Sequence, residues 1–288
     1  MKDLYHMQAV TRKVVLIGCP GEGESFLDEV KHDLNNYKSF FLSERGGSFT
    51  HEEIHSLINP DFGELCTSIN GTTVDYMIVC FSGHGFSNHT GERMLSANNY
   101  SLRDTDLLSH YCPRQLVVID ACRNYPGARI GGIPGLGQDW DYATGPPTRE
   151  IFDQWILESP YGHRIIHGTG DGFISEDTPS GGVFSTALIQ TANNYIPADG
   201  FTYSPVMIEQ LLTDVNAVLK AGHSHQHPCI VYETGDLRVP FAIGKLSDIP
   251  AVANNENIML HQDLNNNNKW LAVIGLGLLC AAIISLGK

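Results

Sequence analysis

Apolar residues along the chain form short continuous runs separated by longer amphipathic stretches. The short runs have the length and the β-branched or aromatic content of buried strands. They occupy residues 14–17, 75–81, 115–119 and 164–167, with two shorter ones at 230–232 and 241–243. We therefore predict a sheet built mainly from these segments.

The stretches between these runs predict helices. They cover residues 24–42, 102–110, 149–157 and 183–193, and a further helix begins at Ser204. A capping box formed by Thr50 and Glu53 predicts one more short helix, extending through Leu57. Because strands alternate with helices, we predict an α/β fold with a mostly parallel sheet flanked by helices.

The longest uncharged run lies near the C-terminus. Residues 270–287 are eighteen residues without a charge, with a lysine on either side. As a helix this run spans roughly 27 Å, just short of the ~30 Å of a hydrocarbon core. We predict a transmembrane tail anchor at 269–288, preceded by an Asn-rich polar linker at 247–268. A buried C-terminal core helix is the alternative.

Small residues within the predicted anchor, Gly277, Ala281 and Ser285, recur every four positions. Such a stripe lets two helices approach closely in lipid, so it favours a homo-oligomer. The N-terminal segment 1–12 lacks the apolar core of a secretory signal. We therefore expect a single-pass membrane protein whose domain 13–246 lies in the cytoplasm, at the inner membrane of a bacterium.

Charge and cysteine content narrow the function classes. Eighteen Lys and Arg stand against 32 Asp and Glu, which gives a formal net charge of -14. This balance excludes a typical nucleic-acid binder, which needs a basic face. The seven cysteines are odd in number and never spaced CxxC, so we expect neither a disulfide framework nor a structural zinc site.

Two of the predicted strands lead into polar motifs. One ends in Ser-Gly-His-Gly at 82–85, and the other ends in Asp-Ala-Cys-Arg-Asn at 120–124. Sites in parallel sheets form at the carboxyl ends of strands, so His84 and Cys122 can meet if the two strands are neighbours. A Cys–His pair supplies a nucleophile and a base for thiol catalysis. An inert thiol and a structural histidine are the alternatives.

These motifs, their order and the 38 positions between His84 and Cys122 resemble the caspase-like cysteine peptidases. That clan includes caspases, metacaspases and their prokaryotic relatives. Gly-Gly-Val-Phe-Ser at 181–185 and Gln-His-Pro at 226–228 are also similar to segments of prokaryotic members. The resemblance covers residues 13–244.

The resemblance implies a role for each motif residue. Cys122 would be the nucleophile and His84 the general acid and base. The backbone N–H groups of Gly85 and Cys122 would form the oxyanion hole, which stabilises charge that develops only in the transition state. No cofactor is expected, and the substrate would be a protein.

Asp120 lies two positions before Cys122, where caspases that cut after Asp carry Gln. The aspartate instead resembles metacaspases, in which an acidic pocket receives Arg or Lys. A carboxylate there pairs with a guanidinium through charge-assisted hydrogen bonds. Asp171 and Glu176 are candidates for a second wall of the pocket. A strand-end cap for Asp120, and ordinary loop charge for the other two, are the alternatives.

Residues 125–147 are rich in Gly and Pro, which predicts an exposed loop. Arg123 and Arg129 lie at its start and are candidates for self-cleavage by a peptidase with a basic preference. The alternative is that they are ordinary exposed arginines.

Other possible sites carry weaker signals. Three histidines, His223, His225 and His227, have no nearby Cys or carboxylate to complete a ligand set, so we expect no metal. The glycine-rich segment 20–24 lacks the Lys-Ser/Thr of a P-loop. No EF-hand pattern supports a calcium requirement.

The leading hypothesis is a membrane-tethered cysteine endopeptidase that cleaves proteins after Arg or Lys. By resemblance to prokaryotic caspase-like effectors, it would act in an immune or cell-death system and be gated by a small signalling molecule or a partner protein. The second hypothesis is a non-proteolytic signal-binding scaffold whose transmembrane helices assemble and perturb the membrane.

Overall fold

The computed structural model describes residues 9–23, 26–121, 147–170, 173–198, 201–236, 238 and 240–246. The strands are β1 (Arg12–Cys19), β2 (Ile54–Ile58), β3 (Tyr76–Gly83), β4 (Gly85–Ser87), β5 (Arg93–Ala97), β6 (Tyr100–Arg103), β7 (Arg114–Ala121), β8 (Gly162–His167), β9 (Asp177–Thr178), β10 (Gly181–Gly182), β11 (Tyr203–Met207), β12 (Cys229–Gly235) and β13 (Pro240–Lys245). The helices are α1 (Glu29–Leu42), α2 (Phe62–Asn70), α3 (Pro147–Glu158), α4 (Val183–Asn193) and α5 (Ile208–Ala221), with short 3-10 helices η2 (His51–Glu53) and η3 (Asp104–Leu107).

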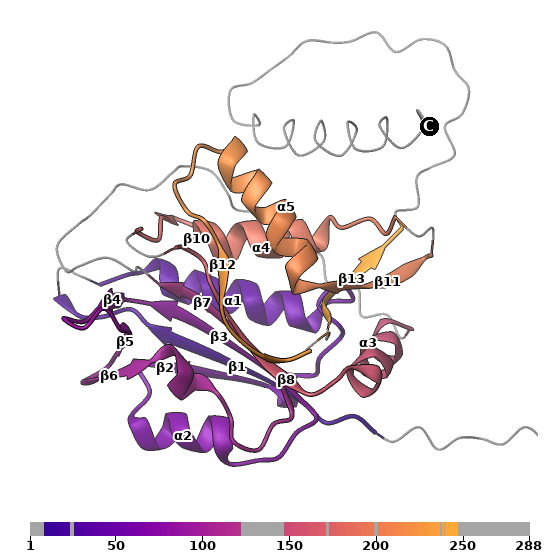
Figure 1. Ribbon diagram of the computed structural model, residues 1–288, viewed down its shortest axis with the longest axis horizontal. Helices are drawn as coiled ribbons and strands as arrows, with labels where there is room; N and C mark the ends of the chain where they lie inside the picture. Colours follow the sequence, from indigo (N-terminus) through magenta and orange to yellow (C-terminus); the bar gives the residue numbers. More distant parts are fainter. Residues whose placement is uncertain are drawn as a thin grey trace, which may run out of the picture.

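Within these residues, a six-stranded sheet has the order β12-β8-β7-β3-β1-β2. Each neighbouring pair is parallel except β12 with β8, which is antiparallel. Helices α1, α4 and α5 cover one face of the sheet and α2 lies against the other (Figure 1). The predicted α/β fold with a mostly parallel sheet is confirmed for the described part of the chain.

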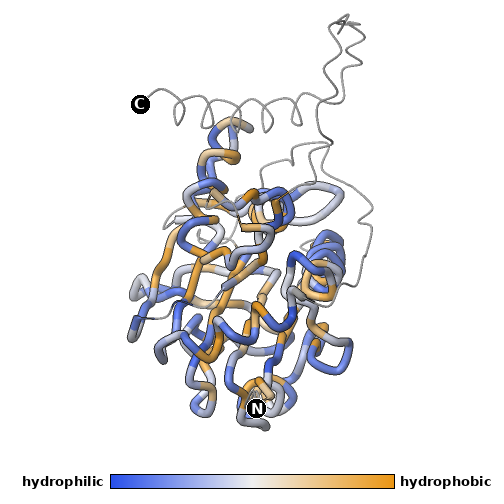
Figure 2. The backbone as a smooth tube through the Cα atoms, turned by 90° about the vertical axis from the view of Figure 1, so that its right-hand side faces the viewer, coloured by the Kyte–Doolittle hydropathy of each residue, from blue (hydrophilic) through white to orange (hydrophobic). Residues whose placement is uncertain are grey.

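The central strands β3 and β7 are buried along their whole length. Alternate residues of these strands belong to two separate hydrophobic cores, one on each face of the sheet. Ile78 and Cys80 lie in the core beneath α1, α4 and α5, and Met77 and Val79 lie in the core beneath α2. Both faces are covered, which is why the two segments read as nearly continuous apolar runs. Figure 2 shows the same pattern, with hydrophobic strands inside and hydrophilic turns outside.

Two predicted helices are wrong. After Thr50, only residues 51–53 are helical, and the predicted capping box caps the start of this short helix. Ile54 then starts β2. Pairing of β2 with β1 outweighs the local helical pattern. In segment 102–110, β6 runs into the single turn of η3.

Two further helices begin later than predicted, and other elements were not predicted at all. The helix expected from residue 24 begins at Glu29, and the helix expected from Ser204 begins at Ile208, because β11 pairs with β13 first. Helix α2 and the β4–β5–β6 sheet were not predicted. Helix α4 has the predicted bounds, and α3 lies within two residues of its prediction.

Several predictions fall on residues outside the described part. They are most of the Gly/Pro-rich loop 125–147, the Asn-rich linker and the tail anchor 269–288. Within the part of the chain that the structure describes, no helix combines the length and the apolar character needed to cross a membrane.

Candidate active site

The structure makes the two motif-bearing strands neighbours, as the active-site prediction requires. β3 pairs with β7 in parallel, and the register sets Ser82 opposite Asp120 and Gly83 opposite Ala121. The residues that follow this last pair in the chain are His84 and Cys122. Cys122 itself lies outside the described residues, as do Arg123, Arg129 and Asp171.

His84 is half-buried directly after β3, at the carboxyl end of the sheet. Its carbonyl oxygen accepts a hydrogen bond of 2.9 Å from the Ser96 N–H. The next residue, Gly85, begins β4 and pairs with Leu95 of β5. The unpredicted β4–β5–β6 sheet therefore fixes the backbone after this histidine, and β3 fixes the backbone before it.

Gly83 is required for the close approach of two strand ends. A Cβ at this position would overlap the Cys19 carbonyl oxygen at the end of β1. The glycine before His84 thus lets β3 pack tightly against β1 where the site begins, which explains one glycine of the motif in steric terms.

Asp120 is buried and surrounded by hydrogen-bond donors. Its Oδ1 accepts from the Ser175 hydroxyl, and its Oδ2 accepts from the Ser185 N–H at 3.0 Å and the Ser185 hydroxyl at 2.8 Å. Ser185 lies in the first turn of α4. Asp120 therefore caps a helix, in addition to any role toward substrate.

A second carboxylate, Asp33 of α1, lies beside Asp120. Its Oδ2 accepts from the Ser82 hydroxyl at 2.6 Å, and its Oδ1 accepts from the Gly182 N–H at 2.8 Å. A Cβ built on Gly182 would overlap Asp120 Oδ2 and lie 3.3 Å from Asp33 Oδ2. One point in space is thus in contact with both buried carboxylates.

The pair Gly181-Gly182 provides the room for these two carboxylates. A Cβ on Gly181, whose φ is +126°, would overlap Asp33 Oδ1, as one on Gly182 would overlap Asp120 Oδ2. The Gly-Gly of the 181–185 motif is therefore explained by close approach of backbone to acidic side chains.

No cationic side chain within the described residues neutralises the two carboxylates. Asp33 and Asp120 take part in none of the ion pairs that these residues form. The positive end of the α4 dipole offsets only part of their charge. Burial, followed by the charge of Asp120, raises the pKa of Asp33 well above its usual range. Burial also raises the pKa of Asp120, against the pull of its Ser175 and Ser185 hydrogen bonds.

A third carboxylate, Asp177 of β9, adds to the negative potential. Burial and the charges of Asp120 and Glu29 raise the pKa of Asp177 to about 7. Glu176, which the sequence made a candidate for a second wall of the pocket, is also buried. Its Oε1 accepts a hydrogen bond of 3.0 Å from the His225 N–H. Glu176 is thus tied to the segment before β12, and nothing places its carboxylate beside Asp120.

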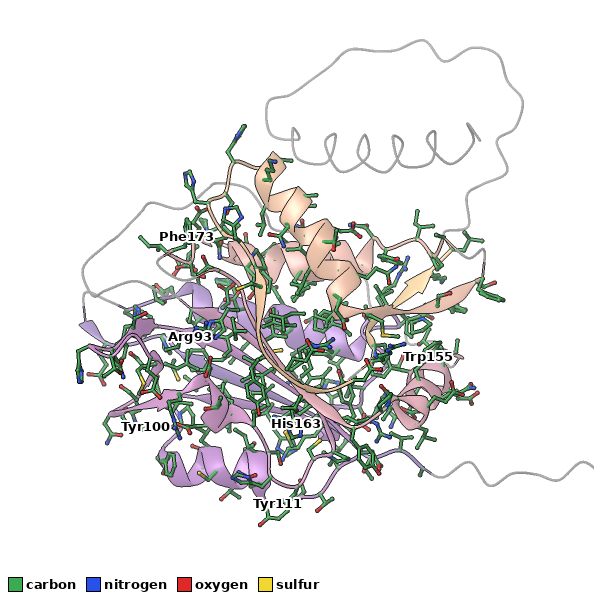
Figure 3. The ribbon with its side chains drawn as sticks, in the orientation of Figure 1. Arg93, Tyr100, Tyr111, Trp155, His163 and Phe173 are labelled. Atoms are coloured by element: carbon green, nitrogen blue, oxygen red, sulfur yellow. The ribbon has the colours of Figure 1, made fainter. Side chains whose placement is uncertain are left out.

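A separate ionic cluster lies where β8 ends. The buried His167 has its Nε2 3.3 Å from Asp104 Oδ2, and Arg93 Nη1 is 3.6 Å from the same oxygen. Figure 3 shows Arg93 and Phe173 toward the end of the sheet that carries β4 and β10, away from Tyr111 and His163. The cluster thus lies on the side of the molecule that carries His84.

The three histidines after the C-terminal end of α5 lie at the surface. His223, His225 and His227 are exposed and alternate with buried residues. Among the described residues, no group of three or more His, Cys, Asp or Glu side chains is placed to hold a metal ion.

Sequence reasoning did not single out Asp33, although the sequence carries a signal for it. Asp33 lies three residues after Val30 and four before Tyr37, so it shares the apolar face of α1. A carboxylate on the buried face of a helix is uncommon and indicates a specific partner or function. Ser185 ends the 181–185 motif, but no local pattern links Ser175 or Ser185 to Asp120, because these contacts span 55 and 65 positions.

Comparison with known proteins identifies the class. The model of the Caspase domain family matches residues 49–238, which is more than half of the chain and includes both the 82–85 and the 120–124 motif. The chain therefore belongs to the caspase domain family of cysteine peptidases.

A solved structure similar to the chain is caspase-1 from Spodoptera frugiperda. It has 18% sequence identity and a TM-score of 0.49, and the match covers 82% of this chain and 92% of that one. No curated protein matches the chain.

Proposed function

We propose that the chain is a cysteine endopeptidase that cleaves protein substrates after Arg or Lys. The observation that carries the preference is the buried pair Asp33 and Asp120, which have donors around them but no cation within the described residues. A guanidinium or ammonium that entered between them would supply the missing positive charge.

The spacing of the motifs supports this assignment. Ser82, which holds Asp33, lies two residues before His84, and Asp120 lies two residues before Cys122. Two residues of strand cover roughly 7 Å. That length is comparable with the reach of an extended Arg or Lys side chain from the backbone to its charged end. The scissile carbonyl of such a substrate would then lie near the catalytic pair.

The chemistry follows from the roles that the family motifs assign. His84 takes the proton of the Cys122 thiol, and the thiolate attacks the carbonyl carbon. The backbone N–H groups of Gly85 and Cys122 stabilise the resulting oxyanion. The C–N bond then breaks, and the amine leaves with the proton from His84. Water hydrolyses the thioester and restores the thiol.

We also propose that the peptidase is tethered and gated. The uncharged run 270–287 supports the tether, and the stripe Gly277, Ala281 and Ser285 supports self-association of the anchors. Resemblance to prokaryotic caspase-like effectors supports a role in immunity or cell death, with a small molecule or a partner protein as activator. Self-cleavage after Arg123 or Arg129 is the proposed maturation step.

Hydrolysis of fluorogenic peptides tests the peptidase function. The full chain in detergent, with and without lysate of stressed cells, should cleave peptides that end in Arg or Lys and spare the matching Asp peptide. Cys122→Ala should lower kcat/KM by about a thousandfold or more, because it removes the nucleophile. Asp33→Asn and Asp120→Asn should each lower kcat/KM for Arg about a hundredfold, because each removes a partner of the substrate charge.

Asp61→Asn is the matched control, because Asp61 also caps a helix: it accepts from the Glu64 N–H at the start of α2. This variant should keep the activity of the unmodified chain. Cleavage only after Asp would contradict the acidic pocket. Silence in every condition would favour the non-proteolytic scaffold.

The affinity for Arg substrates should depend on pH. The raised pKa of Asp33 and Asp120, and the pKa of Asp177 at about 7, mean that protons occupy the site in acid. A protonated carboxyl group carries no charge to attract a cation, so KM should fall as pH rises through neutrality. The fall should be clear around pH 7, where Asp177 loses its proton, and each proton lost from the site can contribute up to about tenfold per pH unit. A flat KM would show that the carboxylates do not bind the substrate cation.

Detergent phase partition tests the tether. The full chain should enter the detergent phase, and deletion of residues 269–288 should move it to the aqueous phase. Leu278→Arg should weaken partition, because a charge at the centre of a span is costly. Asn266→Arg, in the linker, is the control and should leave partition unchanged. Aqueous partition of the unmodified chain would contradict the tether.

A further inference from the structure

The segment 222–228, between α5 and β12, turns every second side chain inward. Gln226 is 1% exposed, whereas its neighbours His225 and His227 point to solvent. Gln226 belongs to the Gln-His-Pro motif of the sequence, and the peptidase roles proposed above do not use it. A fully buried amide without an assigned role therefore needs an explanation.

The Gln226 amide joins the two ends of the loop that follows β8. Its Nε2 donates to the Gly168 carbonyl oxygen at 3.4 Å and to the Ser175 hydroxyl oxygen at 3.1 Å. Because a carbonyl oxygen only accepts, the nitrogen of the amide must face Gly168. Both donor protons of the amide are thus committed to this loop.

This arrangement decides the direction of the Ser175 hydroxyl. A serine hydroxyl has one proton to donate, and the nitrogen of Gln226 beside it has only protons to offer. Ser175 therefore accepts from Gln226 and donates its own proton to Asp120 Oδ1. A hydrogen bond directed at a carboxylate in this way favours its charged form.

We propose that Gln226 is a positioning residue for the recognition of basic substrates: through Ser175, it orients Asp120 and keeps that carboxylate an acceptor for the incoming cation. The proposal rests on the proposed function, in which Asp120 binds the Arg or Lys side chain. Gln226 acts from a distance, since its contacts are with the loop and not with Asp120.

Two more contacts hold the same segment against the same loop. The His225 N–H donates to Glu176 Oε1 at 3.0 Å, and the ring of His227 meets Phe173 edge-on with centroids 5.6 Å apart. These contacts keep Gln226 in register with Ser175. The segment before β12 therefore packs against the loop after β8, which carries Ser175, a hydrogen-bond donor to Asp120.

Other ionisable groups face Asp120. They are Asp33 and Tyr37 of α1 and Asp177 of β9, and the charge of Asp120 contributes to the raised pKa of each. Burial opposes ionisation of Asp120 itself, and the hydrogen bonds from Ser175 and Ser185 favour its charged form. A weaker hydrogen bond from Ser175 should therefore raise the pKa of Asp120 further.

Replacement of the amide by an apolar group of similar length tests the proposal. In the full chain, Gln226→Met should raise KM for an Arg peptide about tenfold, as expected for a weakened hydrogen bond to a charge. The value of kcat should stay within about twofold, because the pair His84 and Cys122 is untouched. In a Ser175→Ala background, Gln226→Met should add little, because the effect runs through Ser175.

Gln115→Met is the matched control. Gln115 is also fully buried and makes two strong hydrogen bonds, with Leu107 O at 2.8 Å and Ser109 N at 2.6 Å, at the opposite end of β7. The Gln115→Met substitution should lower the stability of the folded chain and leave KM for the Arg peptide unchanged. An unchanged KM in Gln226→Met, or a full effect without Ser175, would overturn the proposal while leaving the Arg preference of the parent chain intact.

A second measurement needs no turnover. The carboxyl of Asp120 can be titrated by carbon NMR in the Cys122→Ala chain, with its signal assigned by its loss in Asp120→Asn. Adding Gln226→Met should move the titration of Asp120 toward higher pH, and adding Gln115→Met should not. If Asp120 titrated identically in the Cys122→Ala chain with and without Gln226→Met, the positioning role would be overturned, even if the chain cleaved no peptide.

Discussion

Two carboxylates buried side by side at the carboxyl end of a parallel sheet set the main constraint on this structure. Asp33 and Asp120 come from different elements, α1 and β7, and both contact one point beside Gly182. Burying like charges together opposes folding unless donors or a cation compensate them. The surrounding structure meets much of this demand with hydroxyl and backbone donors, and the proposed function assigns the compensating cation to the substrate.

The neighbouring sequence is arranged around that demand. Glycines at 181 and 182 remove the side chains that would collide with the carboxylates. The Gly182 N–H, just before α4, and the Ser185 N–H, in its first turn, donate to them. Hydroxyl donors come from Ser82 of β3, Ser185 of α4 and Ser175 of the loop after β8. Under the proposed function, such a site trades stability for activity, because its charges remain incompletely compensated until a basic substrate binds. Membership in the caspase domain family explains the placement of the motifs. The acidic pair accounts for the proposed choice of substrate.

The sequence predicted those parts whose signals are local. β3 and β7 are apolar on both faces, so the sequence shows them directly as buried strands. Their pairing was a condition of the active-site prediction, and the structure meets that condition. β2 was mistaken for helix because a five-residue strand is defined by its pairing with β1 and not by its own pattern. Asp33 was missed because its partners Ser82 and Gly182 lie 49 and 149 positions away. Contacts of that range arise only when the chain has folded.

Comparison of an arginine peptide with its citrulline counterpart tests the central claim most directly, because citrulline keeps the shape of the side chain and lacks its charge. The unmodified chain should cleave the arginine peptide with a kcat/KM about a hundredfold or more above that of the citrulline peptide. In Asp33→Asn the ratio should shrink toward one. Equal cleavage of the two peptides by the unmodified chain would contradict the claim that the buried carboxylate pair receives a cation.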